Sequence, residues 1–210
     1  MHDRWRLNRR GVLGGGLSVA AMLAVSPAWA ALAKTPPQGE GPFYPETLPL
    51  DHDNDLVQVK GHPRPAKGQV VHLSGRVLDA KGAPVPGATV EIWQCDAFGV
   101  YRHPSSGGAV DPGFQGFGRT VAAADGGYRF RTIKPVPYPG RAPHIHAAVV
   151  VPGRPRLVTQ IYNAGEAQND SDWIFKSAGA SRRSLEVAYV PAPDSLEKGA
   201  LAGRFDFVLG

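Results

Sequence analysis

The sequence predicts an all-β protein, with a two-sheet β-sandwich core, long irregular loops and an extended N-terminal arm. The chain is rich in residues that form turns, with 26 glycines and 20 prolines among its 210 residues. From residue 69 onward, short apolar or alternating stretches recur between turn signals, as in strands that are buried on one face or on both. Almost no stretch shows a helical period. At this length we expect one domain with a sizeable core.

The strands are expected at regular intervals along the second two thirds of the chain. The first alternates between apolar and polar residues and ends at a turn over 79–82, and a second turn at 84–87 leads into the next strand. The Ala-Asp-Gly-Gly sequence at 124–127 is typical of a hairpin. The expected strands are 70–78, 88–94, 119–121, 128–132, 144–151, 157–162 and 204–209. One short helix is expected at 181–188. This spacing of strands and turns is typical of a two-sheet sandwich.

The chain is expected to divide into three parts. Residues 1–30 have the pattern of an export signal, because Arg9-Arg10 precede a weakly apolar run that ends at Ala28-Trp29-Ala30. The paired arginines favour the twin-arginine route and a periplasmic or secreted protein, with an ordinary secretory signal or a membrane anchor as the alternatives. Residues 31–68 form a Pro-rich arm whose aromatic residues give it something to bury, and residues 69–210 form the sandwich.

Composition excludes several kinds of partner and bond. The net charge is +5, but the first thirty residues contribute +3 of it, so the rest is too weakly basic to indicate nucleic-acid binding. We expect no membrane association of the mature chain. Cys95 is the single cysteine, which excludes an internal disulfide, and its place in an apolar strand predicts a buried thiol. A homo-oligomer is compatible with the sequence.

The candidate site is built on His144-Ile145-His146, at the start of an apolar run that is typical of a buried strand. Residues i and i+2 of a strand point to the same face, so both imidazoles can reach one metal ion. Tyr138 lies on the Pro- and Gly-rich loop just before them, and Tyr101 follows another strand and turn. Two phenolates and two imidazoles suit Fe(III) better than zinc or Cu(I). The alternatives are phenols that only cap the sandwich, or a copper or zinc protein that uses the two histidines.

Many further motifs occur in a fixed order from about residue 39 to the C-terminus. They include Gly41-Pro42-Phe43-Tyr44, Leu73-Ser74-Gly75-Arg76-Val77, Pro84-Val85-Pro86-Gly87-Ala88, Gly99-Val100-Tyr101-Arg102-His103, Pro137-Tyr138-Pro139, Pro143-His144-Ile145-His146 and Thr159-Gln160-Ile161-Tyr162. With these motifs the chain resembles the intradiol ring-cleavage dioxygenases, and the protocatechuate 3,4-dioxygenase subunits more than the catechol 1,2-dioxygenases.

The resemblance implies Fe(III), a small catechol-type substrate and O2, with ring opening between the two hydroxyl-bearing carbons to a cis,cis-muconate-type diacid. It assigns the metal-ligand positions to Tyr101, Tyr138, His144 and His146. It implies that Tyr138 also takes a substrate proton, that Arg141 stabilises the charge that develops on the ring, and that Gln160 hydrogen-bonds nearby. The other histidines, His52, His62, His72 and His103, are interpreted as non-ligands. Arg119 and Arg131 are expected to balance buried carboxylates, and the alternative for either is a position that faces the substrate.

Two features leave the interpretation open. The loop from Tyr138 to His144 is shorter than the resemblance implies, so the mouth of the site and the choice among catechols are not determined. In addition, the stretch from Leu73 to Glu91 is similar to transthyretin-like and carboxypeptidase-regulatory modules. A non-catalytic exported binding module is therefore the second hypothesis, and metal content separates the two.

Overall fold

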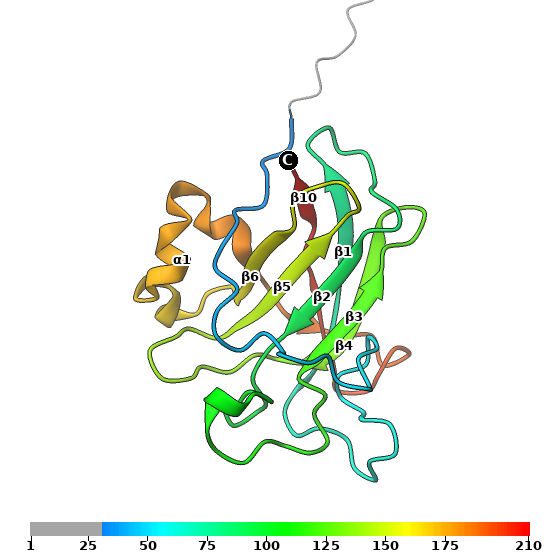
Figure 1. The fold of residues 1–210 in the computed structure, drawn as a ribbon, viewed down its shortest axis with the longest axis vertical. Coiled ribbons are helices and arrows are strands. Elements are labelled where there is room, and N and C mark those ends of the chain that lie inside the picture. The colour runs from blue at the N-terminus through cyan, green and yellow to red at the C-terminus, as the bar shows by residue number, and fades with distance from the viewer. Residues whose placement is uncertain (1–30) are drawn as a thin grey trace, which may run out of the picture.

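The computed structural model describes residues 31–210, and these residues form a two-layer β structure (Figure 1). The expected export signal at 1–30 lies outside the described residues. The first sheet contains β1 (Val70–Asp79), β4 (Gly127–Ile133), β8 (Val190–Pro191), β9 (Leu201–Arg204) and β10 (Phe207–Leu209). The second contains β2 (Thr89–Trp93), β3 (Phe117–Val121), β5 (His144–Val150), β6 (Leu157–Asn163) and β7 (Glu186–Val187). The predicted two-sheet, mostly β fold is confirmed.

Both sheets mix parallel and antiparallel pairs. In the first, β1 runs antiparallel to β4 and parallel to β9 and β10. In the second, the order is β3-β2-β5-β6-β7, and only the β6–β7 pair is parallel. Strand β5, which carries the two site histidines, therefore lies at the centre of its sheet, between β2 and β6. A central strand is held on both edges, so its side chains are well fixed.

Two sequence-based expectations near the C-terminus were met only in part. The single strand expected at 204–209 is two short strands, because the chain leaves β1 at Phe205-Asp206 and rejoins it further along. The side chain of Asp206 there accepts the N–H of Arg76 in place of a ladder bond. The helix expected at 181–188 is a 3-10 helix, η3 (Gly179–Leu185), followed by β7.

Short helices lie beside the second sheet. The one α-helix of the described chain, α1 (Trp173–Ser177), was not anticipated and lies next to β6 (Figure 1). The remaining helical turns are 3-10 in type, η1 (Pro104–Ser106) and η2 (Ala167–Asp170). Among residues 31–210, no helix has the length and apolar character needed to span a bilayer.

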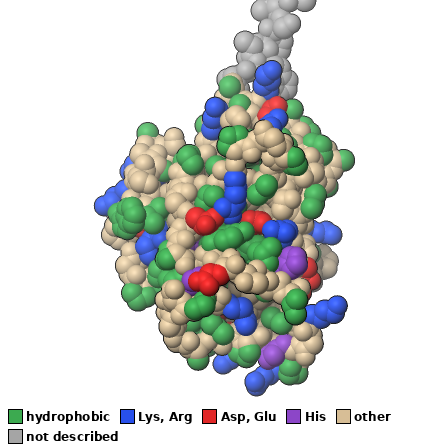
Figure 2. Space-filling view, viewed as in Figure 1, with side chains coloured by type: hydrophobic (Ala, Val, Ile, Leu, Met, Phe, Trp, Pro, Cys, Tyr) green, Lys and Arg blue, Asp and Glu red, His purple; other side chains and the backbone are tan. Residues whose placement is uncertain are grey.

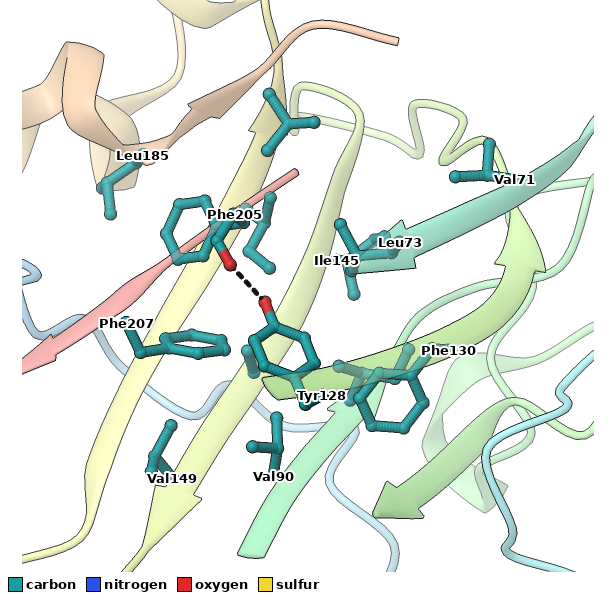
Figure 3. Packing of buried hydrophobic residues seen from close by; sticks show 14 of the residues in the cluster. Val71, Leu73, Val90, Tyr128, Phe130, Ile145, Val149, Leu185, Phe205 and Phe207 are labelled. Atoms are coloured by element: carbon teal, nitrogen blue, oxygen red, sulfur yellow. Dashed lines mark hydrogen bonds between the residues drawn. The ribbon is translucent and has the colours of Figure 1, made fainter. Parts of the chain in front are cut away.

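The core lies between the facing surfaces of the two sheets (Figure 3). Phe130 and Leu73 reach it from the first sheet, and Ile145 reaches it from the second. Tyr128 buries its ring there and donates its hydroxyl to the carbonyl of Phe205 at 2.6 Å, so its polar end is satisfied. Cys95 is also buried, as expected, in a second cluster of apolar residues around Trp93 and Tyr101.

The N-terminal segment packs along the outside of the second sheet before it crosses the end of the sandwich (Figure 1). The backbone N–H of Gln38 donates to Val158, and the hydroxyl of Thr159 donates to Pro36. These contacts fix residues 35–40 on β6. On the face shown in Figure 2, acidic and basic side chains alternate across the middle and do not form a basic stripe.

Candidate active site

The two site histidines converge at the start of β5. Their Nε2 atoms lie 3.1 Å apart, and both side chains are buried. The Nδ1 of His144 lies 2.6 Å from the carbonyl oxygen of Ala142, so this nitrogen carries the proton and Nε2 carries the lone pair. The Nδ1 of His146 has no hydrogen-bond partner in the part of the chain that the structure describes. The i, i+2 spacing thus places both imidazoles on one face, as the sequence predicted.

Burial keeps both imidazoles neutral. It lowers the pKa of His144 to about 4, with the charge of Arg141 acting in the same direction. It lowers the pKa of His146 well below its ordinary value, and the neighbouring His144 and Arg141 add to this effect. Neutral imidazole is the form that binds metals. Two buried Nε2 atoms at hydrogen-bond distance, each able to present a lone pair, are suited to a shared cation.

The two phenols complete the group. The ring centroid of Tyr101 lies 5.5 Å from that of Tyr138 and 6.0 Å from that of His146, and Tyr138 lies 5.4 Å from His144. Burial, reinforced by the nearby Tyr138, raises the pKa of Tyr101 well above its ordinary value. Its buried hydroxyl makes no hydrogen bond with the described residues. A buried phenol without a partner is costly, and a metal ion at this point would satisfy it as phenolate.

Other candidate ligands are excluded by the structure. Residues 31–210 contain no group of three or more His, Cys, Asp and Glu side chains that could hold a metal ion. Tyr101 and Tyr138 are therefore the side chains that could join the two histidines around a metal at this point. Among residues 31–210 three other histidines bond elsewhere, His52 to Pro49, His62 to Arg64 and His72 to Glu197. The ring of His103 caps η1 through the N–H of Ser105.

Arg141 connects the phenol to the strand next to the histidines. Its Nη1 donates to the hydroxyl of Tyr138 at 3.1 Å, and its Nη2 donates to Oε1 of Gln160 at 2.6 Å. In the β5–β6 ladder, Gln160 lies directly opposite His146, and Tyr162 lies opposite His144. The Tyr162 hydroxyl donates to the same oxygen of Gln160 at 2.8 Å. The structure thus brings together all six residues that the sequence singled out.

Sequence reasoning missed Asp172, whose carboxylate binds the guanidinium of Arg141. Its Oδ2 accepts Nε of Arg141 and the N–H of Ala142, both at 2.9 Å, and its Oδ1 caps α1 through Ile174 and Phe175. Burial raises the pKa of the Asp172 carboxyl, but these N–H donors and the guanidinium outweigh burial and lower it. An aspartate before a short apolar stretch is a recognisable helix cap. No local pattern links it to an arginine 31 residues away.

The arm also shapes the site, which the sequence did not reveal. The ring of Phe43 stacks on Tyr101 with centroids 4.4 Å apart. Gly41 has φ +77°, and a Cβ there would lie 3.2 Å from Cε1 of His146. On the other side, the Trp93 ring stacks on His146 at 5.0 Å and 10°. The metal-capable face of β5 therefore lies between aromatic rings of the arm and of β2.

The expected balance of carboxylates by arginines is found in full for one pair. Arg119 donates to the buried carboxylate of Glu91 at 2.6 Å. Arg131 pairs with Glu197 at 2.6 Å and with Asp55 at 3.0 Å, but both of these carboxylates are partly exposed. Neither arginine faces the candidate site, since the guanidinium at the site is that of Arg141.

A cleft of about 570 Å³ opens beside Tyr138 and Arg141. We call it the Tyr138 cleft, and its lining residues are 137–142 together with Gln168, Ser171 and Asp172. A second cavity of about 100 Å³ lies on the side of Trp93, Phe43 and Tyr101. Of the four candidate ligands, Tyr138 lines the larger opening together with Arg141, and Tyr101 lines the smaller cavity.

Comparisons with known proteins agree with this geometry. A family described as "Dioxygenase" matches residues 39–210. The protocatechuate 3,4-dioxygenase beta chain of Burkholderia cepacia is 38% identical over 77% of this chain and 72% of its own length. The 6-chlorohydroxyquinol 1,2-dioxygenase of Cupriavidus pinatubonensis is 34% identical over 83% of this chain and 64% of its own length.

A solved structure is similar as well. The dioxygenase domain of a dioxygenase–carbohydrate-binding protein fusion from Streptomyces sp. SirexAA-E superposes with a TM-score of 0.65 at 34% identity. The superposition covers 84% of this chain and 98% of that domain. The similarity therefore extends over the whole sandwich and over the elements that carry the candidate site.

Proposed function

This chain belongs to the intradiol ring-cleavage dioxygenase family, and on that premise we propose that it is a non-haem Fe(III) enzyme. It uses O2 to cleave a catechol-type ring between the two hydroxyl-bearing carbons, giving a cis,cis-muconate-type diacid. One observation carries the proposal: two buried imidazoles, the buried phenol of Tyr101 and the partly buried phenol of Tyr138 converge, with neighbouring ring centroids 4.7 to 6.0 Å apart. A non-catalytic sandwich module has no use for such a group.

The residues present fit a ferric ion. Tyr101, Tyr138, His144 and His146 would hold it through two hard anionic oxygens and two neutral nitrogens. The partnerless hydroxyl of Tyr101 supports this assignment, because a phenol without a hydrogen bond is otherwise expensive to bury. Bound Fe(III) would supply the charge that makes both phenols ionise and would bind the two substrate oxygens.

The protein side chains supply the acid–base and electrostatic parts of the reaction. Tyr138 lies at the edge of the cleft, so its phenolate oxygen is the group in reach of an incoming substrate hydroxyl and takes that proton. Nη1 of Arg141 already donates to this oxygen, and the same guanidinium stabilises negative charge as it develops on the ring. Oε1 of Gln160 accepts Nη2 of Arg141 and so holds the guanidinium in its orientation toward Tyr138. The burial of His144, His146 and Tyr101 lowers the local dielectric constant, which strengthens the electrostatic interactions.

The colour of the protein tests the ligand set. Tyrosinate bound to Fe(III) gives a visible charge-transfer band, so the purified protein should be burgundy-red and contain iron rather than copper or zinc. Tyr101→Phe and Tyr138→Phe should each shift or bleach the band, whereas Tyr189→Phe, which changes another buried phenol, should not. A colourless protein with a full complement of iron would refute the assignment. Oxygen uptake with a set of catechols, with product identification, tests the reaction itself.

We also propose that the protein is exported through the twin-arginine route before it acts. The support is the sequence of residues 1–30, with Arg9-Arg10 and the Ala-x-Ala pattern at 28–30. Fractionation of cells that express the full chain should place the protein outside the cytoplasm, with a mature N-terminus near residue 31. Lysines in place of Arg9 and Arg10 should retain it in the cytoplasm. Export of the double variant at the normal rate would exclude this route.

A further inference from the structure

The Tyr138 cleft is lined by one cation and one anion, and these neutralise each other. Among its lining residues, only Arg141 and Asp172 carry charge. Nε of Arg141 lies 2.9 Å from Oδ2 of Asp172, and the side chains are 10% and 0% exposed. A buried pair at this distance presents little net charge to a ligand. The guanidinium is thus available to a ring oxygen through its polar N–H groups, but it is not a free positive charge.

The segment that supplies the outer wall of the cleft carries no cation, and of its carboxylates only Asp172 lines the cleft. Residues 166–172, which include η2, contain three carboxylates, Glu166, Asp170 and Asp172, and no lysine or arginine. Of these, Asp170 faces solvent and pairs with Arg183 at 3.0 Å. The opposite wall, 137–142, contributes prolines, glycine and Tyr138, with Arg141 as its only charge. A negatively charged ring substituent would meet no free cation on either wall.

Uncharged polar groups are available instead at the mouth. The side chain of Gln168 is exposed and makes no hydrogen bond to the described residues, although its backbone carbonyl accepts the Ser171 hydroxyl. The amide of Gln168 can therefore donate to or accept from a hydroxyl on the ligand. Pro137 and Pro139 offer flat apolar contact for the ring.

We infer that the Tyr138 cleft selects catechols that carry no charge beyond the diol, whether unsubstituted, hydroxylated or alkylated, over carboxylated catechols. The inference rests on the proposed function, because it assigns the substrate class of that same site. A carboxylate drawn into the cleft loses hydration and gains no partner, which is the usual basis of strong discrimination against a charged analogue.

The test compares the iron-loaded protein with catechol, 1,2,4-trihydroxybenzene and 3,4-dihydroxybenzoate. We expect kcat/KM for the two neutral compounds to exceed that for the carboxylate by at least about tenfold. Gln168→Lys adds the missing cation and should raise the relative kcat/KM for the carboxylate by about tenfold at low salt, an effect that shrinks as salt screens the charge. Ser195→Lys, an equal charge on the β8–β9 connection, should leave the ratio unchanged.

Two results would overturn the inference. One is a wild-type preference for the carboxylate, and the other is an unchanged ratio in Gln168→Lys. Binding of the same three compounds, followed by tryptophan fluorescence without O2, gives a second readout. If no compound is cleaved, the proposed function fails, yet tighter binding of the neutral compounds still supports the charge selection and tighter binding of the carboxylate refutes it.

Discussion

Asp172 is the residue whose removal best tests how the site is built. Its carboxylate is fully buried, and it serves two structures at once, the Arg141 guanidinium through Oδ2 and the first turn of α1 through Oδ1. Asp172→Ser keeps a side-chain oxygen that caps a helix nearly as well as aspartate does, but it is too short and uncharged to hold the guanidinium. The substitution therefore separates the two tasks.

The expected magnitudes follow from burial. Removing one partner of a buried ion pair costs about 3–5 kcal/mol, because the other charge stays in a dry environment. With Arg141 only 10% exposed, we expect Asp172→Ser to lose about 3 kcal/mol of unfolding free energy, and Asp172→Ala about 1 kcal/mol more because the cap is also lost. A guanidinium displaced by about 1 Å from its working position lowers kcat by about 100-fold. Iron content and colour should not change, since Asp172 contacts none of the proposed ligands.

Urea unfolding and steady-state turnover of catechol measure these effects. The decisive control is the Arg141→Ala background, because a residue that acts through Arg141 has nothing left to act on there. Arg141→Ala should keep iron and colour and lose most turnover. Adding Asp172→Ser to it should then change kcat by less than about twofold, a strongly non-additive result. A folded Asp172→Ser variant with wild-type kcat would refute the argument.

Two further predictions follow from other contacts. Arg131 chiefly lowers the pKa of Glu197, from 4.5 to about 2, so this carboxylate stabilises the fold above pH 4.5 and loses its effect as the pH falls toward 2. The unfolding free energy of Glu197→Gln should therefore lie below that of wild type by a constant amount at pH 5–7 and approach it at lower pH, and a gap that is undiminished at pH 2.5 would contradict this. Gly41→Ala should cost about 1 kcal/mol in backbone strain and also displace His146, weakening iron binding and shifting the visible band. The matched control is Gly61→Ala, where φ is +81° but no atom lies within 4 Å, so stability alone should fall.

The strands that could be predicted from the sequence are those whose pattern of apolar residues lies within the strand itself. Strand β5 is an apolar run, and β1 alternates between apolar and polar residues over its length. Each can therefore be recognised without knowing which strands pair with it. The interruption at Phe205-Asp206 depends on how the chain re-registers along β1, which no local pattern records. The predicted end of the helix at 181–188 was wrong for the same reason, because Glu186 and Val187 pair with β6 as an edge strand.

The candidate site likewise has one part that could be predicted from the sequence and one part that could not. The i, i+2 spacing of His144 and His146 dictates a shared face once the strand is known, and this prediction was confirmed. The restraint of Arg141 by Asp172 requires a loop and a helix to meet across the end of a sheet, so it could only be found in three dimensions.

A buried carboxylate explains why the arm belongs to the site. Glu91, on β2, is 3% exposed, and it accepts from Arg119 at 2.6 Å, from the hydroxyl of Tyr44 at 3.1 Å and from Arg156 at 3.3 Å. Such a pairing adds little net stability, because desolvation offsets most of the attraction. Its effect is geometric. Three groups, from the arm, from β3 and from the residue just before β6, must meet at one point, and this fixes the register of the arm on the sheet.

That register carries through to the proposed metal ligands. Tyr44 is adjacent in the chain to Phe43, and the ring of Phe43 stacks on Tyr101. Gly41, three residues before Tyr44, lies against the ring of His146. A shift of the arm by one residue would replace the stacked ring with Pro42 or Tyr44 and would bring a side chain against His146. The anchor at Glu91 therefore sets the positions of one phenol and one imidazole without touching either, which is how a Pro-rich segment of little intrinsic structure comes to form one wall of the site.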